Sequence, residues 1–121
     1  MKNENVIKEV SKSINYKGKD YKIVFNLNVM EQIQDEYGTL TKWGTLTDGS
    51  EGEVNIKALI FGFTCMLNEG IEIDNEENET DVKPLTKKQV GRMITAIGLD
   101  EMTNKLNETV TESTRSEEKN V

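Results

Sequence analysis

The segment from Tyr21 to Leu27 has the clearest pattern of hydrophobic and polar positions in the chain. Its alternate residues fall into two sets, one of Tyr21, Ile23, Phe25 and Leu27 and the other of Lys22, Val24 and Asn26. Period-two alternation with β-branched and aromatic residues predicts a β-strand. Ile14 and Tyr16 also alternate, and a turn signal around Gly18 follows them. We therefore expect an N-terminal β-hairpin over about 13–26, in which residues 13–17 pair with 21–26.

The hydrophobic period changes from that of a strand to that of a helix after Leu27. Asn28 is a favourable N-cap residue, and Glu31 lies three positions later, which is the spacing of a capping box. The apolar side chains that follow share one helical face: Val29, Met30, Ile33 and Tyr37. Gly38 suits the left-handed residue that ends many helices. The pattern predicts a helix over 29–37.

Four further segments combine helical spacing of apolar residues with local start or stop signals. They predict helices at 40–47, 56–69, 86–97 and 101–110. The segment 56–69 is apolar around most of its girth, which is typical of a helix at the centre of a core, and Gly70 is its expected end. Thr86 and Gln89 form a capping box at the start of the next helix.

The remaining stretches are polar and acidic. Residues 72–81 read EIDNEENETD and lack an apolar period, so we expect an exposed, mobile loop there. From residue 111 onward the chain has no apolar anchor before Val121. The sequence therefore predicts one α+β domain over 1–110, mostly α, with an N-terminal β-hairpin followed by four to five amphipathic helices, and a flexible, disordered acidic C-terminal tail over 111–121.

Composition narrows the classes of function. The chain has 22 acidic and 15 basic residues and a net charge of −7, which disfavours nonspecific binding to nucleic acid or anionic lipid. It has no histidine and one cysteine, which excludes Ser–His and Cys–His nucleophile pairs and His-containing zinc sites. Cys65 lies in an apolar run, as expected for a buried, reduced thiol in a cytosolic protein. We expect no signal peptide, and the longest apolar run, Ala58 to Phe63, is too short to cross a membrane.

Candidate chemistry is sparse. Asp74, Glu76 and Asn78 have the alternating spacing of an EF-hand calcium loop. The glycine and the bidentate glutamate of such a loop would fall at Glu79 and Leu85, so a solvated loop is the favoured interpretation. The glycines form no phosphate-binding pattern. The sequence thus predicts a binding protein that is not an enzyme and uses no metal or cofactor.

The segment from Tyr16 to Leu46 has a distinctive order of elements: a short strand, a glycine-containing turn, a second strand and an amphipathic helix. The second strand ends in FNLN (25–28), and the helix closes on EYG (36–38). A later stretch, PLTKKQV (84–90), begins another helix. In these features the chain resembles the tail assembly chaperones of long-tailed bacteriophages and prophages.

The resemblance implies a non-catalytic chaperone that binds tape-measure protein and tail-tube protein during tail assembly in the cytoplasm of the bacterial host cell. It also implies self-association into a homo-oligomer. A holding chaperone needs exposed apolar surface, and its own solubility must come from net charge. The alternative is an acidic protein-binding or DNA-mimic inhibitor of a host nucleic-acid-binding protein, which would require carboxylates in a duplex-like double row.

We expect the partner to contact apolar side chains at the end of the hairpin and on the first two helices. The candidate partner-binding residues are Phe25, Leu27, Met30, Tyr37, Leu40 and Trp43. Methionine and aromatic side chains adapt to varied partners. The alternative is that these side chains form the domain's own core, which the helical period favours for Leu27, Met30 and Ile33. The stretch from Tyr37 to Trp43 is the part that we expect to face a partner.

Overall fold

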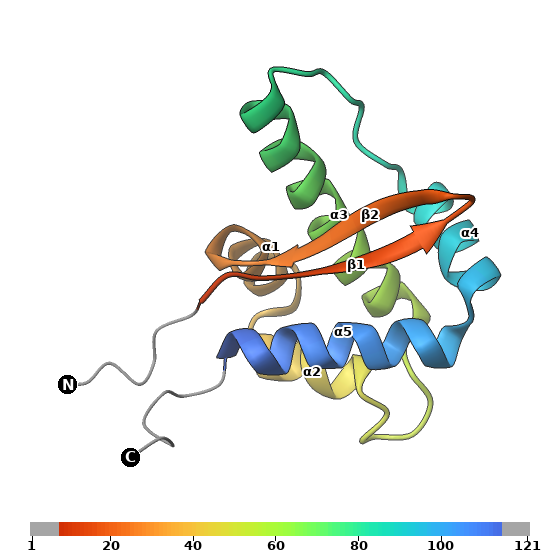
Figure 1. Cartoon of the computed structure of the whole chain (residues 1–121). Helices are drawn as coiled ribbons and strands as arrows, with labels where there is room; N and C mark the ends of the chain where they lie inside the picture. The colour runs from red at the N-terminus through yellow and green to blue at the C-terminus, as the bar shows by residue number, and fades with distance from the viewer. Residues whose placement is uncertain (1–7, 115–121) are drawn as a thin grey trace, which may run out of the picture.

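The computed structural model describes residues 8–114, which form a two-stranded hairpin followed by five helices (Figure 1). The elements are β1 (Val10–Tyr16), β2 (Lys19–Phe25), α1 (Leu27–Tyr37), α2 (Leu40–Thr47), α3 (Ile56–Asn78), α4 (Lys87–Ile97) and α5 (Leu99–Thr114). The predicted α+β class, with mostly helical content, is confirmed. Residues 1–7 and 115–121 lie outside the described part of the chain, and with them most of the predicted tail.

The hairpin is antiparallel and closes in a two-residue turn. Val10 lies opposite Phe25, and the pairing continues without a bulge to the turn. The turn residues, Lys17 and Gly18, both have positive φ, 54° and 77°. Two positive φ values are typical of the tight turn whose twist matches that of the flanking strands. The predicted hairpin is therefore confirmed, although its pairing begins at residue 10 rather than at residue 13.

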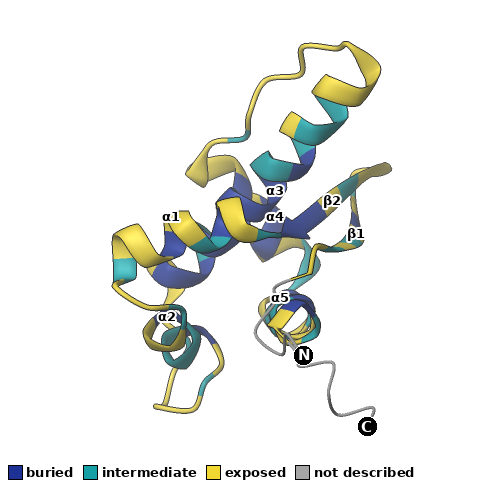
Figure 2. Ribbon diagram, turned by 90° about the vertical axis from the view of Figure 1, so that its left-hand side faces the viewer, coloured by how far each residue is buried: buried dark blue, intermediate teal, exposed yellow. Residues whose placement is uncertain are grey.

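The second strand is buried on both of its faces near its end. Ile23, Val24 and Phe25 are all buried, and Figure 2 shows this part of β2 in dark blue. The alternating pattern placed Val24 on a polar face with Lys22. That prediction is wrong for Val24, because α1, α3 and α5 all pack against β2.

Helix α3 is the centre of the fold, since it packs against β2, α1, α2 and α4. It does not end at residue 69 as predicted. Gly70 is buried inside the helix, and a Cβ atom at this position would lie 2.9 Å from the carbonyl oxygen of Lys22. The glycine thus allows α3 and β2 to approach closely and does not act as a stop signal.

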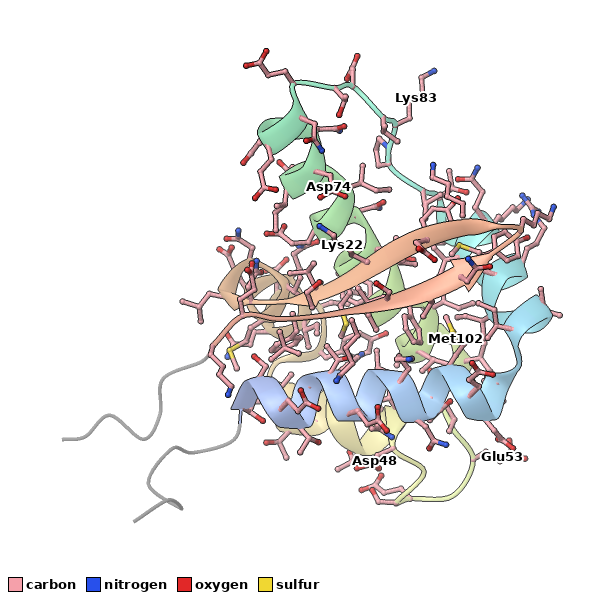
Figure 3. The ribbon with its side chains drawn as sticks, viewed as in Figure 1. Lys22, Asp48, Glu53, Asp74, Lys83 and Met102 are labelled. Carbon is pink, nitrogen blue, oxygen red and sulfur yellow. The ribbon has the colours of Figure 1, made fainter. Side chains whose placement is uncertain are left out.

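The acidic stretch that was predicted to be a mobile loop is helical from residue 72 to residue 78. Its carboxylates lie on the solvated end of α3, where Asp74 Oδ1 is 3.0 Å from Lys22 Nζ (Figure 3). The hydrogen bond and the charge of Asp74 raise the pKa of Lys22. The residue that caps the C-terminus of α3 is Glu79, a non-glycine residue with φ 56°, whose N–H donates to the Asn75 carbonyl. The wrong prediction arose because a solvated helix end needs no apolar period.

Two side-chain amides of α3 fix the return segment, which we define as residues 80–86. Asn68 Oδ1 accepts from the Leu85 N–H at 2.7 Å, and Asn68 Nδ2 donates to the Leu85 carbonyl at 3.0 Å. Asn75 pairs in the same way with Val82, with both distances 3.0 Å. The two asparagines are seven residues, or about two helical turns, apart. They place the return segment along α3 and so set where α4 begins.

The helix caps are in part those predicted. The capping box of α4 is confirmed: Gln89 N–H donates to Thr86 Oγ1 at 3.1 Å, and Thr86 N–H donates to Gln89 Oε1 at 2.8 Å. At α1, Asn28 is not the cap, because the helix begins earlier. The side chain of Asn26 accepts from the Val29 N–H at 3.2 Å and caps α1 instead.

Helix α5 runs through residue 114 instead of ending at residue 110. The Ser113 hydroxyl is buried and donates to the Lys8 carbonyl at 2.6 Å, and Lys12 Nζ lies 3.0 Å from Glu112 Oε2. Residues 111–114, predicted as part of the disordered tail, are therefore helical and contact the start of the hairpin at Lys8 and Lys12. An apolar pattern could not predict this contact, because hydrogen bonds and an ion pair make it.

Candidate protein-interaction surface

The six predicted partner-binding residues differ widely in how exposed their side chains are. Phe25 and Trp43 are 0% and 1% exposed, so these two are core residues and the prediction that they contact a partner is wrong. Met30, Tyr37 and Leu40 are half-buried and pack against the core. Only Leu27 has a largely free side chain, 63% exposed. The six residues do not form one continuous apolar surface.

Trp43 of α2 is buried because α3 has a notch that fits it. Its indole Nε1–H donates to the Ala58 carbonyl at 3.0 Å. The ring lies over Gly62, where any Cβ atom would overlap the indole and come within 3.1 Å of Cε2. A buried indole with a satisfied N–H is a stable core arrangement. Trp43 is therefore part of the core, whereas the expectation that the rest of the stretch from Tyr37 faces a partner stays a prediction.

Tyr37 is also held against α3. Its ring meets the ring of Phe61 edge to face, with centroids 5.5 Å apart and planes at 72°. Burial, with a smaller effect of Glu36, raises the pKa of Tyr37. Lys87 Nζ lies 5.5 Å from the centroid of Phe61 on the α4 side. The rings of Tyr37 and Phe61 are therefore engaged in contacts within the protein.

A large apolar opening lies elsewhere, between the N-terminal part of α3 and α4. We call it the α3–α4 groove. It has a volume of about 710 Å³. Its apolar lining consists of Ile56, Leu59, Ile60, Ile94, Ala96 and Leu99. Ile56 and Leu99 are 48% and 41% exposed, and they are two of the four large hydrophobic side chains that are exposed within residues 8–114.

The groove is open because a glycine lies on its α4 wall. Gly91 lines the groove, and a Cβ atom built on it would be in ordinary contact, 3.6 Å, with Cδ1 of Ile60. A larger side chain at this position would occupy the space that the groove leaves free. Gly98 then ends α4, and the next residue, Leu99, begins α5 at the edge of the groove. The helix junction thus brings a leucine to the opening.

The groove is flanked by positive charge. Lys88 and Arg92 line it from α4, and both are exposed. Helix α4 has three basic residues, Lys87 being the third, and no acidic residue, although the whole chain has a net charge of −7. Within residues 8–114, neither Lys88 nor Arg92 forms an ion pair. The groove therefore offers apolar surface beside unpaired cations.

Sequence reasoning assigned Ile56, Leu59 and Ile60 to the core helix and did not identify the groove. The signal that could have found it is Gly91, a glycine inside an amphipathic helix, where it costs about 1 kcal/mol relative to alanine. The position of Leu99 at the groove depends on how α4 and α5 meet. A one-dimensional pattern does not contain that information.

Other chemistry is not assembled in the part of the chain that the structure describes. Residues 8–114 contain no group of three or more His, Cys, Asp or Glu side chains that could hold a metal ion. Cys65 is buried, and burial raises the pKa of its thiol to about 11. The thiol is thus protonated at neutral pH and is a poor nucleophile. Among the described helices, none has the length and apolar content needed to cross a membrane.

Comparison of the chain with protein-family models, with curated proteins and with solved structures finds no match.

Proposed function

We propose that this protein is a non-catalytic tail assembly chaperone, which binds tape-measure protein, and also tail-tube protein, in the cytoplasm of a bacterial host. The observation that carries the proposal is the α3–α4 groove: a large apolar opening with exposed Ile56 and Leu99. The resemblance of the segment 16–46 to such chaperones supplies the particular class of partner. A homo-oligomer belongs to the same proposal and is tested by sedimentation of the purified chain.

The groove meets the first physical requirement of a holding chaperone. Such a protein must present apolar surface that a partner covers, and contiguous exposed apolar patches on soluble proteins often mark interaction sites. Ile56 and Leu99 keep large side chains in contact with water at the groove, with 48% and 41% of each exposed. Their exposure is costly for a free monomer and favourable when a partner segment covers them.

The charge of the chain meets the second requirement. A net charge of −7 on 121 residues makes copies of the protein and of its complexes repel one another, which favours solubility. The acidic end of α3 supplies part of this charge, with Glu72, Glu76 and Glu77 exposed to solvent. The groove is the local exception, because its flanking charges are positive.

The test is co-expression of the chain with the tape-measure protein encoded by the same phage or prophage. We expect the soluble yield of the tape-measure protein to rise several-fold and the two proteins to co-purify. As a control, the chain is replaced by a variant in which the groove is polar, Ile56→Ser with Leu99→Ser. If the tape-measure protein is equally soluble with and without the chain, and the two never co-purify, the proposed function is wrong.

A further inference from the structure

We infer that the α3–α4 groove binds an amphipathic helix of the partner in which an apolar stripe is flanked by aspartate or glutamate. The inference rests on the proposed function, in that it names the kind of segment that the chaperone would hold. The shape of the groove and the charges beside it support this kind of segment.

The shape of the groove favours a helix. Both walls are helices, with Ile56, Leu59 and Ile60 on α3 and Ile94 on α4. Side chains on the surface of one helix form ridges that pack between those of its neighbours, so two helices with a gap between them suit a third helix. An amphipathic helix in an apolar groove is a common mode of recognition, with anchors at i, i+3, i+4 and i+7. A volume of about 710 Å³ holds several such side chains.

The charges favour an acidic occupant. Lys88 and Arg92 are four residues apart on α4, so they lie on the same side of the helix, about 6 Å apart along its axis. Carboxylates at i and i+4 on a bound helix have the same spacing. Among residues 8–114, no acidic side chain lines the groove, so none in this part of the chain competes within the lining for the two cations. A helix flanked by lysine or arginine would instead meet like charges.

The experiment uses two designed helical peptides of about 18 residues, with the same leucines at i, i+3, i+4 and i+7. One has glutamate beside the leucine stripe and the other has lysine. Fluorescence anisotropy of the labelled peptides measures binding to the full chain. We expect the glutamate peptide to bind about tenfold more tightly than the lysine peptide at low salt, and the difference to shrink as salt rises.

Three variants of the chain sharpen the result. Lys88→Glu with Arg92→Glu should reverse the preference between the two peptides. Lys42→Glu with Lys83→Glu changes the net charge equally at exposed residues outside the groove and should leave the preference intact. Ile56→Ser with Leu99→Ser should weaken both peptides, because it removes the apolar contacts. Far-ultraviolet circular dichroism of each variant verifies that it is folded.

The outcomes separate this inference from the proposed function. A preference that Lys88→Glu with Arg92→Glu does not reverse, or that the control pair also reverses, overturns the inference even if the tape-measure protein still co-purifies. Equal binding of the two peptides also overturns the inference. Failure of the wild-type chain to bind either peptide, because a second copy of the chain covers the groove, overturns the inference as well. A reversed preference with no capture of the tape-measure protein supports the inference and contradicts the proposed function.

Discussion

The indole of Trp43 lies directly over Gly62, and the absence of a side chain on Gly62 is what allows α2 to pack against α3. The same indole donates its N–H to the Ala58 carbonyl, one helical turn earlier. A residue expected to face a partner is therefore one of the main contacts inside the protein. We therefore propose the α3–α4 groove, and not Trp43, as the contact surface for a partner.

Replacement of Gly62 by alanine should destabilise the protein by about 1 to 3 kcal/mol, because the new Cβ atom would force the buried indole to shift. The matched control is Gly44→Ala, which is also inside a helix but has no atom within 4 Å of the new Cβ. That variant should be more stable than wild type by about 0.5 to 1 kcal/mol. Urea denaturation measures both free energies of unfolding. Equal effects of the two substitutions would contradict the packing of Trp43 on Gly62.

Asn68→Ala should release the return segment near Leu85. It removes a paired donor and acceptor and leaves the Leu85 N–H and carbonyl, which are half-buried, without a partner, at a cost of about 1 to 3 kcal/mol. Asn75→Ala removes the corresponding pair at Val82, which is exposed, and should cost less because water replaces the lost bonds. Hydrogen exchange at residues 80–86 gives the measurement. Unchanged exchange at Leu85 in Asn68→Ala would contradict this role.

The Cys65 thiol should react slowly with iodoacetamide at pH 8 in the folded protein and rapidly in urea. Its pKa rises from its ordinary value of about 9 to about 11 on burial, so at pH 8 the unfolded state contains far more of the reactive thiolate than the folded state. Stability due to the thiol is fully present below pH 9 and falls as pH rises toward 11, because the unfolded state binds fewer protons in that interval. The loss amounts to about 2 to 3 kcal/mol.

The control for this pH dependence is Cys65→Ala, which lacks the titrating group. The difference in unfolding free energy between wild type and Cys65→Ala should change between pH 9 and pH 11 and stay constant below pH 8. A constant difference across the whole range would show that the thiol is accessible to solvent.

Gly91→Ala should stabilise α4 by about 0.5 to 1 kcal/mol, since the new Cβ atom would be at an ordinary contact distance from Ile60. Gly91→Met, in contrast, places a long apolar side chain in the groove and should block the binding of a partner without unfolding the protein. Thermal unfolding and partner binding, measured on the same two variants, test both statements. Unimpaired partner binding by Gly91→Met would place the contact surface elsewhere.

The hairpin and the capped helix α4 could be predicted from the sequence because both depend on neighbours along the chain. Alternation of apolar residues identified β2, and Thr86 with Gln89 identified the start of α4. The length of α3 could not be predicted, because Gly70 has the appearance of a stop signal and its real role depends on contact with Lys22. Sequence alone does not distinguish a glycine that ends a helix from a glycine that allows a strand to pack closely against the helix.

The proposed interaction surface was harder to predict than the fold. Trp43 and Phe25 are the kind of large apolar residues that occur both in cores and at interfaces, and sequence spacing does not separate the two roles. The α3–α4 groove is made by residues 56–60 and 88–99, which the chain brings together only when α4 folds back on α3. The residues beside the groove are basic although the net charge of the chain is negative, so the overall composition did not indicate a basic site.

The central claim is that the α3–α4 groove is the surface that holds the partner. Hydrogen exchange of the chain, alone and in complex with the tape-measure protein, tests it most directly. We predict that the partner slows exchange in residues 56–60 and 88–99 and leaves residues 27–43 unchanged. Protection confined to residues 27–43, with the groove unaffected, would contradict the claim.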